Sequence, residues 1–266
     1  MPSVPPMTSC RLLSFYEEMN PSKRKTMEDT IRVVDGFLCT PQNGFFAVYD
    51  GHGEVDLYTK TKRKIGRHVS VYLQDRLHKV IEAEAARKDG ATMEELLERA
   101  FILTDMDCCM EEYSENTGST AVVAVIVQEG PERMLYTANA GDSRAVLCKD
   151  GNAIRLSQDH KAENPEEAIQ NRVSGVLAIT RSFGDRWLKR WVISKPFVSR
   201  TMVDEHVDFI ILACDGVWDE LDDQEAVNIV LALDPLERSQ AAKYLVDSAL
   251  EQGSCDNISA VVIFLK

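Results

Sequence analysis

The stretch AVVAVIVQEGPERMLYTANAGDSRAVLC, residues 121–148, decides the fold of this chain. Its apolar side chains recur with a period of two or in short unbroken runs over residues 121–127, 134–140 and 145–148. Gly130 and Pro131 interrupt the pattern once, and Gly141 and Asp142 interrupt it again, as is typical of turns. The stretch therefore predicts three consecutive strands joined by short turns.

Outward from these strands the pattern predicts further strands and pairs of helices. Upstream, residues 31–37 and 44–49 predict two strands, apolar positions between 69 and 81 share one helical face, and Thr92 with Glu95 forms a capping box that opens a helix running to residue 110. Downstream we expect a strand over 209–214, helices over 224–233 and 236–252, and a last strand over 258–265. Runs of strands interrupted by paired helices favour a layered α+β sandwich over a parallel βαβ sheet.

Length and composition predict one large domain. A chain of 266 residues with 44% hydrophobic content can bury a single core. Residues 1–22 contain four prolines around a short apolar patch and predict a loosely attached arm or an edge strand. Residues 23–266 then form the one folded domain.

Charge and cysteine content exclude several classes of partner. The formal charge of -13 repels phosphate backbones, so we expect no nucleic-acid binding. No apolar run reaches the roughly 20 residues of a membrane helix, and Pro2 breaks the myristoylation pattern, so we expect no membrane partner. Seven cysteines without metal-finger spacing, and no signal peptide, predict a reducing intracellular compartment. We expect a soluble cytoplasmic protein, and we expect it to be a monomer. For the basic run at residues 60–67 we favour a solvated helix face and leave a nuclear address open.

Acidic side chains stand at the ends of the expected strands. They are Glu28 and Asp29, Asp50, Asp142, Asp215 and Asp256. Each by itself is explained at least as well by a turn, since Asp-Gly and Asp-Asn suit turns and loops. Five such coincidences are harder to dismiss, and a cluster of like charges is tolerated when cations neutralise it. Oxygen ligands favour magnesium or manganese, so the sequence predicts a site for two such ions.

A two-metal site predicts a phosphohydrolase, because paired cations bind a phosphoryl group and lower the pKa of a bridging water. Arg24 is the expected phosphate clamp, with an ordinary surface arginine in a basic triplet as the alternative. His52 is the expected general acid for the leaving oxygen, and a purely structural histidine is equally open.

Eight sequence blocks follow one another between Arg24 and Phe264. They are RKTMED (24–29), FFAVYDGHG (45–53), GSTAVVAVI (118–126), ANAGDSRAVL (138–147), SQDHKAENPEE (157–167), LAITRSFGD (177–185), IILACDGVWDEL (210–221) and DNISAVVI (256–263). In these blocks and their order the chain resembles the type 2C, or PPM, family of metal-dependent serine/threonine protein phosphatases. The resemblance implies a central antiparallel β-sandwich flanked by pairs of antiparallel helices, in four layers α/β/β/α. It also implies a signalling hydrolase of phosphoprotein substrates that attacks phosphoserine and phosphothreonine with a metal-bridging water.

The resemblance implies a role for each matching site residue. It gives the two-metal centre, of Mg²⁺ or Mn²⁺, to Asp50, the Gly51 carbonyl, Glu28 or Asp29, Asp215 and Asp256. It gives a weaker third ion to Asp142, Asp215 and Asp219, where the alternative for Asp219 is an acid at a helix N-terminus. Arg24 grips the phosphate, and His52 is the general acid.

One segment and one loop depart from the family. Glu54 replaces a second glycine, and residues 166–176 predict a truncated flap. After Asp185 the chain interleaves two tryptophans with cations, which predicts a flap that contacts the substrate through Trp187, Lys189, Arg190 and Trp191. Tryptophans that anchor the flap to the body are an equal alternative.

Two other functions compete with the phosphatase interpretation. A catalytically dead family member that serves as a binding module predicts missing ligands, yet all the acids and Arg24 are present. A hydrolase of nucleotides or small phosphoesters calls for a dedicated pocket, and the sequence has no glycine-rich phosphate loop.

Overall fold

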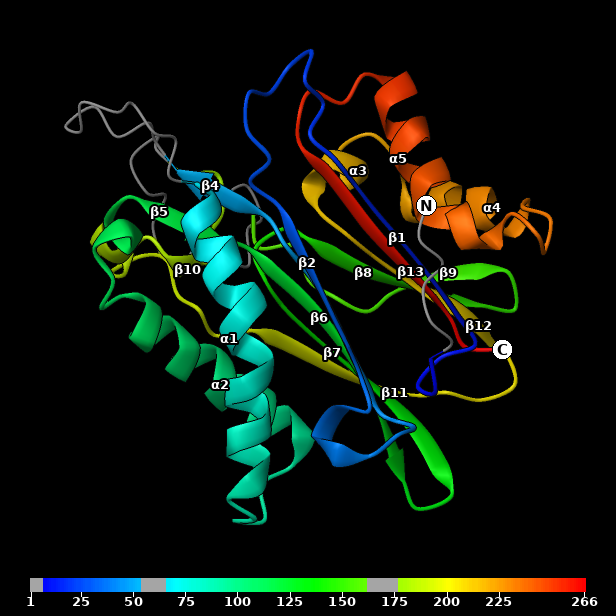
Figure 1. Ribbon diagram of the computed structural model, residues 1–266, viewed down its shortest axis with the longest axis horizontal. Coiled ribbons are helices and arrows are strands. Elements are labelled where there is room, and N and C mark those ends of the chain that lie inside the picture. Colours follow the sequence, from blue (N-terminus) through cyan, green and yellow to red (C-terminus); the bar gives the residue numbers. More distant parts are fainter. Residues whose placement is uncertain (1–6, 54–65, 162–176) are drawn as a thin grey trace.

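A computed structural model describes residues 7–53, 66–161 and 177–266, and two five-stranded antiparallel sheets lie face to face at its centre (Figure 1). The first sheet has the order β11-β7-β6-β3-β2 and the second the order β1-β13-β12-β8-β9. The strands of the first are Phe197–Met202, Glu132–Ala140, Ala121–Glu129, Gly44–Tyr49 and Thr30–Asp35 in that order. Those of the second are Leu12–Glu18, Ile258–Phe264, Val207–Ala213, Arg144–Lys149 and Asn152–Arg155.

Helices cover the outer face of each sheet (Figure 1). The pair α1 (Arg67–Ala86) and α2 (Met93–Cys108) packs on the first sheet. On the second lie α3 (Asp215–Trp218), α4 (Asp223–Leu231) and α5 (Ala241–Gln252). The predicted α+β sandwich of four layers is confirmed.

The alternation of side chains along each strand produces this layering. In β3, Phe45, Ala47 and Tyr49 join the core beneath α1 and α2, whereas Phe46 and Val48 join the core between the sheets. All five are fully buried, so both faces of the strand are covered. Full burial stabilises the fold by about 1.5–3 kcal/mol for each large apolar side chain.

Several predicted boundaries shift in the structure. The strand expected over 31–37 ends at Asp35, because Gly36 turns the chain with φ of 71° and Phe37 begins a short 3-10 helix, Phe37–Cys39. The helix expected from residue 236 begins at Ala241, after a 3-10 turn at Arg238–Gln240, and Leu236 is 93% exposed. The Thr92–Glu95 capping box is confirmed, with the Glu95 amide donating to Thr92 Oγ1 at 3.3 Å.

Three short strands form a small separate sheet of order β10-β5-β4. They are Phe183–Gly184, Thr117–Ser119 and Gly51–Gly53, and the sequence pattern did not predict any of them. It also missed β9 and β11. Because β4 carries His52 and β10 precedes Asp185, this sheet positions residues that matter below.

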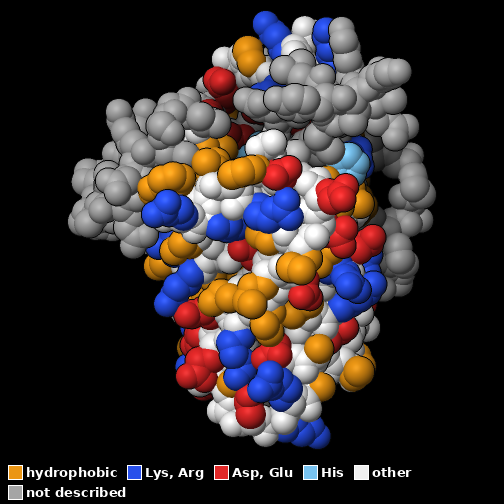
Figure 2. Space-filling view, turned by 90° about the vertical axis from the view of Figure 1, so that its left-hand side faces the viewer, with side chains coloured by type: hydrophobic (Ala, Val, Ile, Leu, Met, Phe, Trp, Pro, Cys, Tyr) orange, Lys and Arg blue, Asp and Glu red, His pale blue; other side chains and the backbone are white. Residues whose placement is uncertain are grey.

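The outer face formed by α1 and α2 mixes both signs of charge. Figure 2 shows Lys and Arg interspersed there with Asp and Glu, around scattered apolar side chains. The described helices include none that is long and apolar enough to cross a membrane.

Candidate active site

A cleft of about 290 Å³ opens where strands of both sheets end. Pairing of Thr30 with Tyr49 places Asp29 beside Asp50, at the ends of β2 and β3. Pairing of β12 with β13 likewise brings Asp215 and Asp256 together from the second sheet. Strand pairing thus gathers acids that are far apart in sequence. The described lining residues are Arg24, Glu28, Asp50, Gly51, His52, Gly53, Thr120, Asp142, Leu177, Ala178, Ile179, Asp215 and Asp256.

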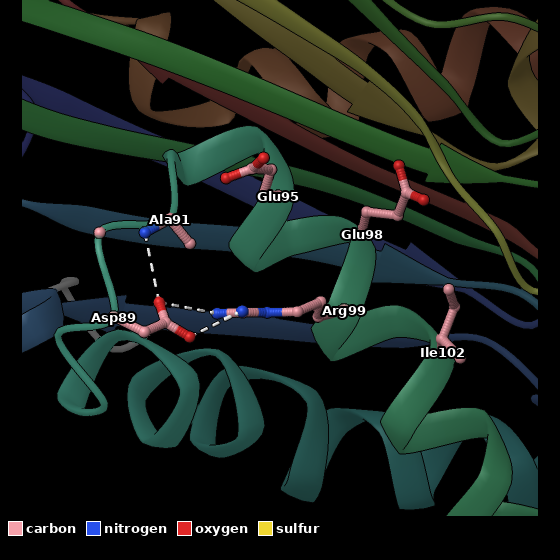
Figure 3. A pocket seen from close by; sticks show the side chains of 7 residues that line it. Asp89, Ala91, Glu95, Glu98, Arg99 and Ile102 are labelled. Atoms are coloured by element: carbon pink, nitrogen blue, oxygen red, sulfur yellow. Dashed lines mark hydrogen bonds and ion pairs between the residues drawn. The ribbon is translucent and has the colours of Figure 1, made fainter.

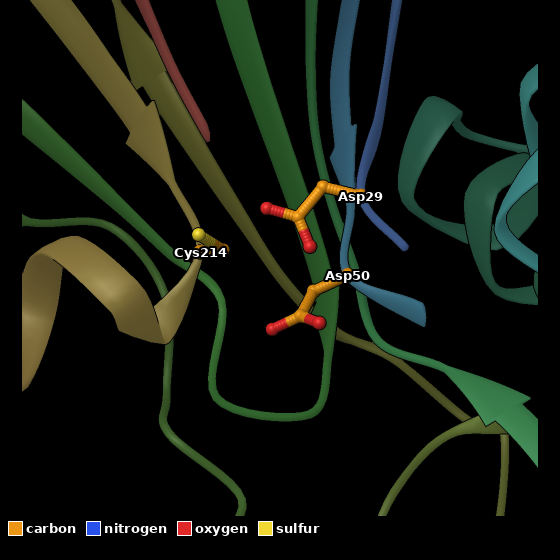
Figure 4. A group of neighbouring side chains, drawn as sticks. All are labelled: Asp29, Asp50 and Cys214. Carbon is orange, nitrogen blue, oxygen red and sulfur yellow. The ribbon is translucent and has the colours of Figure 1, made fainter. Parts of the chain in front are cut away.

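Asp29 and Asp50 form the floor of this site with Cys214. Ligand atoms of the three lie within 4.8 Å of one another, and Figure 4 shows the two carboxylates together with the Cys214 sulfur across from them. Asp29 is buried, and neither of its oxygens has a hydrogen-bond partner of normal geometry among the described residues. Oδ1 of Asp215 also lacks such a partner. Unsatisfied buried carboxylate oxygens are unfavourable unless a cation binds them.

Without cations, the buried acids Asp29, Asp50 and Asp142 hold their protons more tightly than usual. Burial, with the charges of Asp215 and Asp256, outweighs the opposing effect of the nearby Ser259 and Cys214 side chains and raises the pKa of Asp29 to about 7. Burial and the Asp215 charge raise the pKa of Asp142 to about 7 as well. Loss of hydration and the Asp29 charge raise the pKa of Asp50 well above its usual value. A divalent cation reverses this preference because it stabilises the ionised forms, so the donor set fits magnesium or manganese.

Glu28 and Asp29 are both at the site but in different surroundings. Glu28 lines the cleft, and Thr26 donates to its Oε1 at 2.9 Å, whereas Asp29 lies deeper. Asn257 contacts both Asp256 and Glu28. The Asn257 backbone amide donates to Asp256 Oδ1 at 2.6 Å, and the Asn257 side-chain Oδ1 accepts from the Glu28 backbone amide at 2.9 Å. One asparagine therefore ties the two sheets together beside the acids.

Lys161 stands between the two residues expected to hold a third ion. Its Nζ is 2.7 Å from Oδ1 of Asp219 and 3.9 Å from Oδ2 of Asp142. A third cation must therefore compete with an ammonium group of this chain. The alternative for Asp219, an acid at a helix N-terminus, is wrong, because Asp219 is the C-cap of α3.

Arg24 lies at the rim of the cleft and binds one of the acids. Its Nη2 is 2.5 Å from Oδ2 of Asp256, and its Nε donates to the Cys255 carbonyl at 3.1 Å. The side chain is 36% exposed. The guanidinium thus stays accessible to an anion while Asp256, an acid of the cluster, holds it in place.

His52 has a charged partner that its sequence neighbourhood does not reveal. Its Nε2 is 2.8 Å from Oδ2 of Asp185, a residue 133 positions further along the chain. Ser182 Oγ donates to the same oxygen at 2.5 Å. Burial opposes a charge on His52, yet Asp185 outweighs it and raises the pKa of the imidazole. The ring therefore keeps its transferable proton to higher pH.

The expected flap divides into exposed and internal residues. Trp187 is 66% exposed and Trp191 37%, and the Arg190 guanidinium lies over the Trp191 ring at 5.8 Å. Lys189 points the other way, since its Nζ is 2.8 Å from Oδ2 of Asp105 and donates to the Ser182 carbonyl at 2.9 Å. We therefore correct the assignment of Lys189 to substrate contact. For the other three the contact stays a prediction, because the described lining of the cleft includes none of them.

A second hollow of about 570 Å³ lies at the turn between α1 and α2 (Figure 3). Its central charges are already paired, with Arg99 Nη1 donating to Asp89 Oδ2 at 2.8 Å and the Ala91 amide donating to Asp89 Oδ1 at 3.2 Å. This hollow is larger than the cleft, but Arg99 Nε, a buried lining nitrogen without a hydrogen bond, lies 3.0 Å from the Glu84 carboxylate, so its charge is balanced. The clustered acids, and not the volume, identify the cleft as the candidate active site.

Three interpretations fall on residues outside the described ranges. They concern Glu54, the truncated flap at residues 166–176, and most of the basic run at 60–67. Of that run, Arg67 is described, and its Nη1 donates to the Met27 carbonyl at 3.2 Å.

Comparison with known proteins agrees with this arrangement. Residues 15–258 match the family model described as protein phosphatase 2C. The chain is 38% identical to protein phosphatase 2C homolog 1 of Schizosaccharomyces pombe, over 99% of its own length and 76% of the relative's. It is 36% identical to the homolog 1 of Saccharomyces cerevisiae, over 94% and 92%.

Solved structures show the same fold at lower identity. A sex determining protein of C. elegans superposes with a TM-score of 0.82 at 23% identity, over 96% of this chain and 64% of that one. A serine-threonine phosphatase 2C from Toxoplasma gondii superposes with a TM-score of 0.70 at 20% identity, over 96% and 94%.

Proposed function

This chain belongs to the protein phosphatase 2C family, and we propose that the acidic cleft is where it hydrolyses phosphoserine and phosphothreonine. The protein is thus a metal-dependent serine/threonine protein phosphatase. One observation carries the assignment of the site: acids from both sheets converge at this cleft, and buried oxygens of Asp215 and of Asp29 beneath it have no hydrogen-bond partner of normal geometry among the described residues.

Two cations, Mg²⁺ or Mn²⁺, are the proposed occupants. We assign them to Asp50, the Gly51 carbonyl, Asp29 or Glu28, Asp215 and Asp256. When bound, such ions supply the positive charge that polarises a phosphate and lowers the pKa of an attacking water. We place no third ion in the resting enzyme, because the Lys161 ammonium already neutralises Asp219.

The residues of the chain itself bind the phosphate and supply the proton. Arg24 presents a planar fork to two phosphate oxygens at the cleft rim. His52 donates a proton to the serine or threonine oxygen as it leaves. Since Asp185 engages Nε2, the nitrogen that delivers this proton is Nδ1. The dead-module alternative receives no support, because most of the acids line one cleft with Arg24 and His52, and Asp29 lies directly beneath it beside Asp50.

The direct test is phosphate release from a phosphothreonine peptide by the purified protein. We expect turnover with added Mg²⁺ or Mn²⁺ and none after chelation with EDTA, because the cluster lacks its counter-charge without metal. A nucleoside monophosphate at the same concentration should react far more slowly. Undiminished activity in EDTA, or inactivity with every divalent ion, contradicts the proposal.

Arg24→Ala should mainly raise the KM for phosphopeptides, by about tenfold or more, since a charge-assisted hydrogen bond contributes about 1.5–3 kcal/mol. The reason is that the clamp binds ground state and transition state alike. Steady-state kinetics measure the effect, with Arg24→Lys expected to restore only part of it because an ammonium lacks the fork. Lys23→Ala, which removes an adjacent exposed cation, is the matched control. A loss confined to kcat argues against the clamp.

Phosphoproteins are the substrate class that the family implies. The monomeric state and the cytoplasmic location stay predictions.

A further inference from the structure

We propose that Lys189 and Asp105 are positioning residues for the general acid: their ion pair fixes the turn at Gly184 and Asp185, and that turn holds His52. The inference rests on the proposed role of His52 and extends the catalytic apparatus to helix α2.

The contacts form a continuous chain from α2 to the cleft. Oδ2 of Asp105 is 2.8 Å from Lys189 Nζ, and its Oδ1 accepts the Gly184 amide at 2.9 Å. Lys189 reaches back across the turn and donates to the Ser182 carbonyl at 2.9 Å. The next residue after Gly184 is Asp185, which binds His52 Nε2 at 2.8 Å. Every link is therefore at hydrogen-bond distance.

The turn needs this support because its backbone is strained. Asp185 adopts φ of 48° and ψ of 44°, a left-handed conformation that costs a non-glycine residue free energy. Its amide donates to the Thr117 carbonyl at 2.8 Å, so one side is fixed by β5. On the other side the Asp105–Lys189 pair fixes Gly184 and Ser182. Removing that pair lets the turn relax and shifts the Asp185 carboxylate away from the imidazole.

Asp185 and His52 are tightly packed against the backbone of β5. A side-chain carbon at Gly118 would meet the Asp185 carboxylate at 2.1 Å and His52 Nε2 at 2.5 Å. The histidine–carboxylate pair thus rests directly on the backbone of β5. Asp105 itself is only 6% exposed, so the Lys189 ion pair is a shielded contact and not a solvated surface pair.

The hypothesis that the ion pair only stabilises the fold and the hypothesis that it positions His52 predict different results. If the pair only stabilises the fold, Lys189→Met lowers the melting temperature and leaves the chemistry of the folded enzyme unchanged. If it positions His52, the damage falls on the step that uses the proton. An alkoxide leaving group needs that proton, whereas p-nitrophenolate leaves without it.

The experiment compares kcat for a phosphothreonine peptide and for p-nitrophenyl phosphate, with saturating Mg²⁺. Lys189→Met should lower peptide kcat about tenfold, since displacing a catalytic group by up to 1 Å costs up to about 10²-fold. Turnover of p-nitrophenyl phosphate should change less than about twofold. In a His52→Gln background Lys189→Met should cause no further loss, because both act through one group. Lys189→Arg should restore most of the peptide activity.

Two further variants keep the test decisive. Asp105→Asn still accepts the Gly184 amide but loses the ion pair, so it should reproduce Lys189→Met even if that variant folds poorly. Lys149→Met is the matched control, since Lys149 forms a 2.7 Å ion pair with Asp204 far from the cleft, and it should leave both activities intact.

The outcomes separate this inference from the proposed function. Equal losses on both substrates, additive losses in the double variant, or full peptide activity in folded Lys189→Met and Asp105→Asn overturn the positioning role alone. If His52→Gln itself slows both substrates equally, the general-acid assignment falls, and the positioning role falls with it.

Discussion

Asp50→Asn should lower the kcat for a phosphothreonine peptide by about 100-fold or more, while the metal-free protein becomes more stable. Turnover falls because the variant loses one charge of the set proposed to bind the cations, which contribute several kcal/mol of transition-state stabilisation. Stability rises because Asp50 lies among acids that repel it and raise its pKa. The free energy of unfolding of the metal-free protein should therefore increase.

The stability gain should depend on pH in a defined direction. The folded-state pKa of Asp50 is raised, so protonation favours the native state, and this contribution is lost as pH rises through the folded pKa. Asparagine has no such proton to lose. The advantage of Asp50→Asn over the metal-free wild type should therefore be small near pH 4 and grow toward pH 8.

Denaturant melts in EDTA measure this difference, and saturating Mg²⁺ should reduce or reverse it. Asp107→Asn, which neutralises an exposed acid on α2, is the control and should change neither turnover nor stability appreciably. If Asp50→Asn retains wild-type turnover, or is less stable than wild type in EDTA at pH 8, the repulsive acidic centre is not at this position.

His52→Gln should slow the phosphothreonine peptide by about 10²-fold or more, the usual contribution of a positioned general acid. Glutamine keeps a polar side chain of similar reach but cannot transfer a proton near neutral pH. The loss with p-nitrophenyl phosphate should be much smaller, because its leaving group needs no proton. Paired kcat measurements on the two substrates check this.

His206→Gln provides the control for His52→Gln. His206 also has an aspartate partner, with its Nδ1 3.0 Å from Asp150 Oδ1, but it is exposed and remote from the cleft. It should leave both activities unchanged. Parallel losses on both substrates in His52→Gln are the result that removes the general-acid role.

Much of the acidic centre could be predicted from sequence because local patterns determine it. Period-two strands locate their own ends, and acids at those ends must meet when antiparallel strands pair. Asp29 and Asp50 are the clear case, since Thr30 opposes Tyr49 in the neighbouring strand. The capping box at Thr92 was equally local, and it too is confirmed.

The partners of the catalytic side chains could not be predicted in the same way. Asp185 binds His52, and Asp105 binds Lys189, through contacts between elements widely separated in the chain. The hydrophobic periodicity of a sequence does not indicate which side chains of distant elements will pair. The alternation of tryptophan and cation after Asp185 favoured a flap that faces the substrate. That pattern does not distinguish an exposed lysine from Lys189, which faces inward and pairs with Asp105. The short strands β4, β5 and β10 were missed because two or three residues cannot display a period.

The order of strands in the second sheet bears on how the protein is made. Strand β13 lies between β1 and β12, and Leu12 pairs with Phe264. A ribosome has therefore synthesised every strand of the first sheet, through Met202, before it makes β12 and β13. Until then the strand that pairs with β1 does not exist, and the acidic cluster lacks Asp215 and Asp256. Domains tend to fold as units during synthesis, so a nascent phosphatase stays inactive toward phosphoproteins until nearly this whole stretch has been translated.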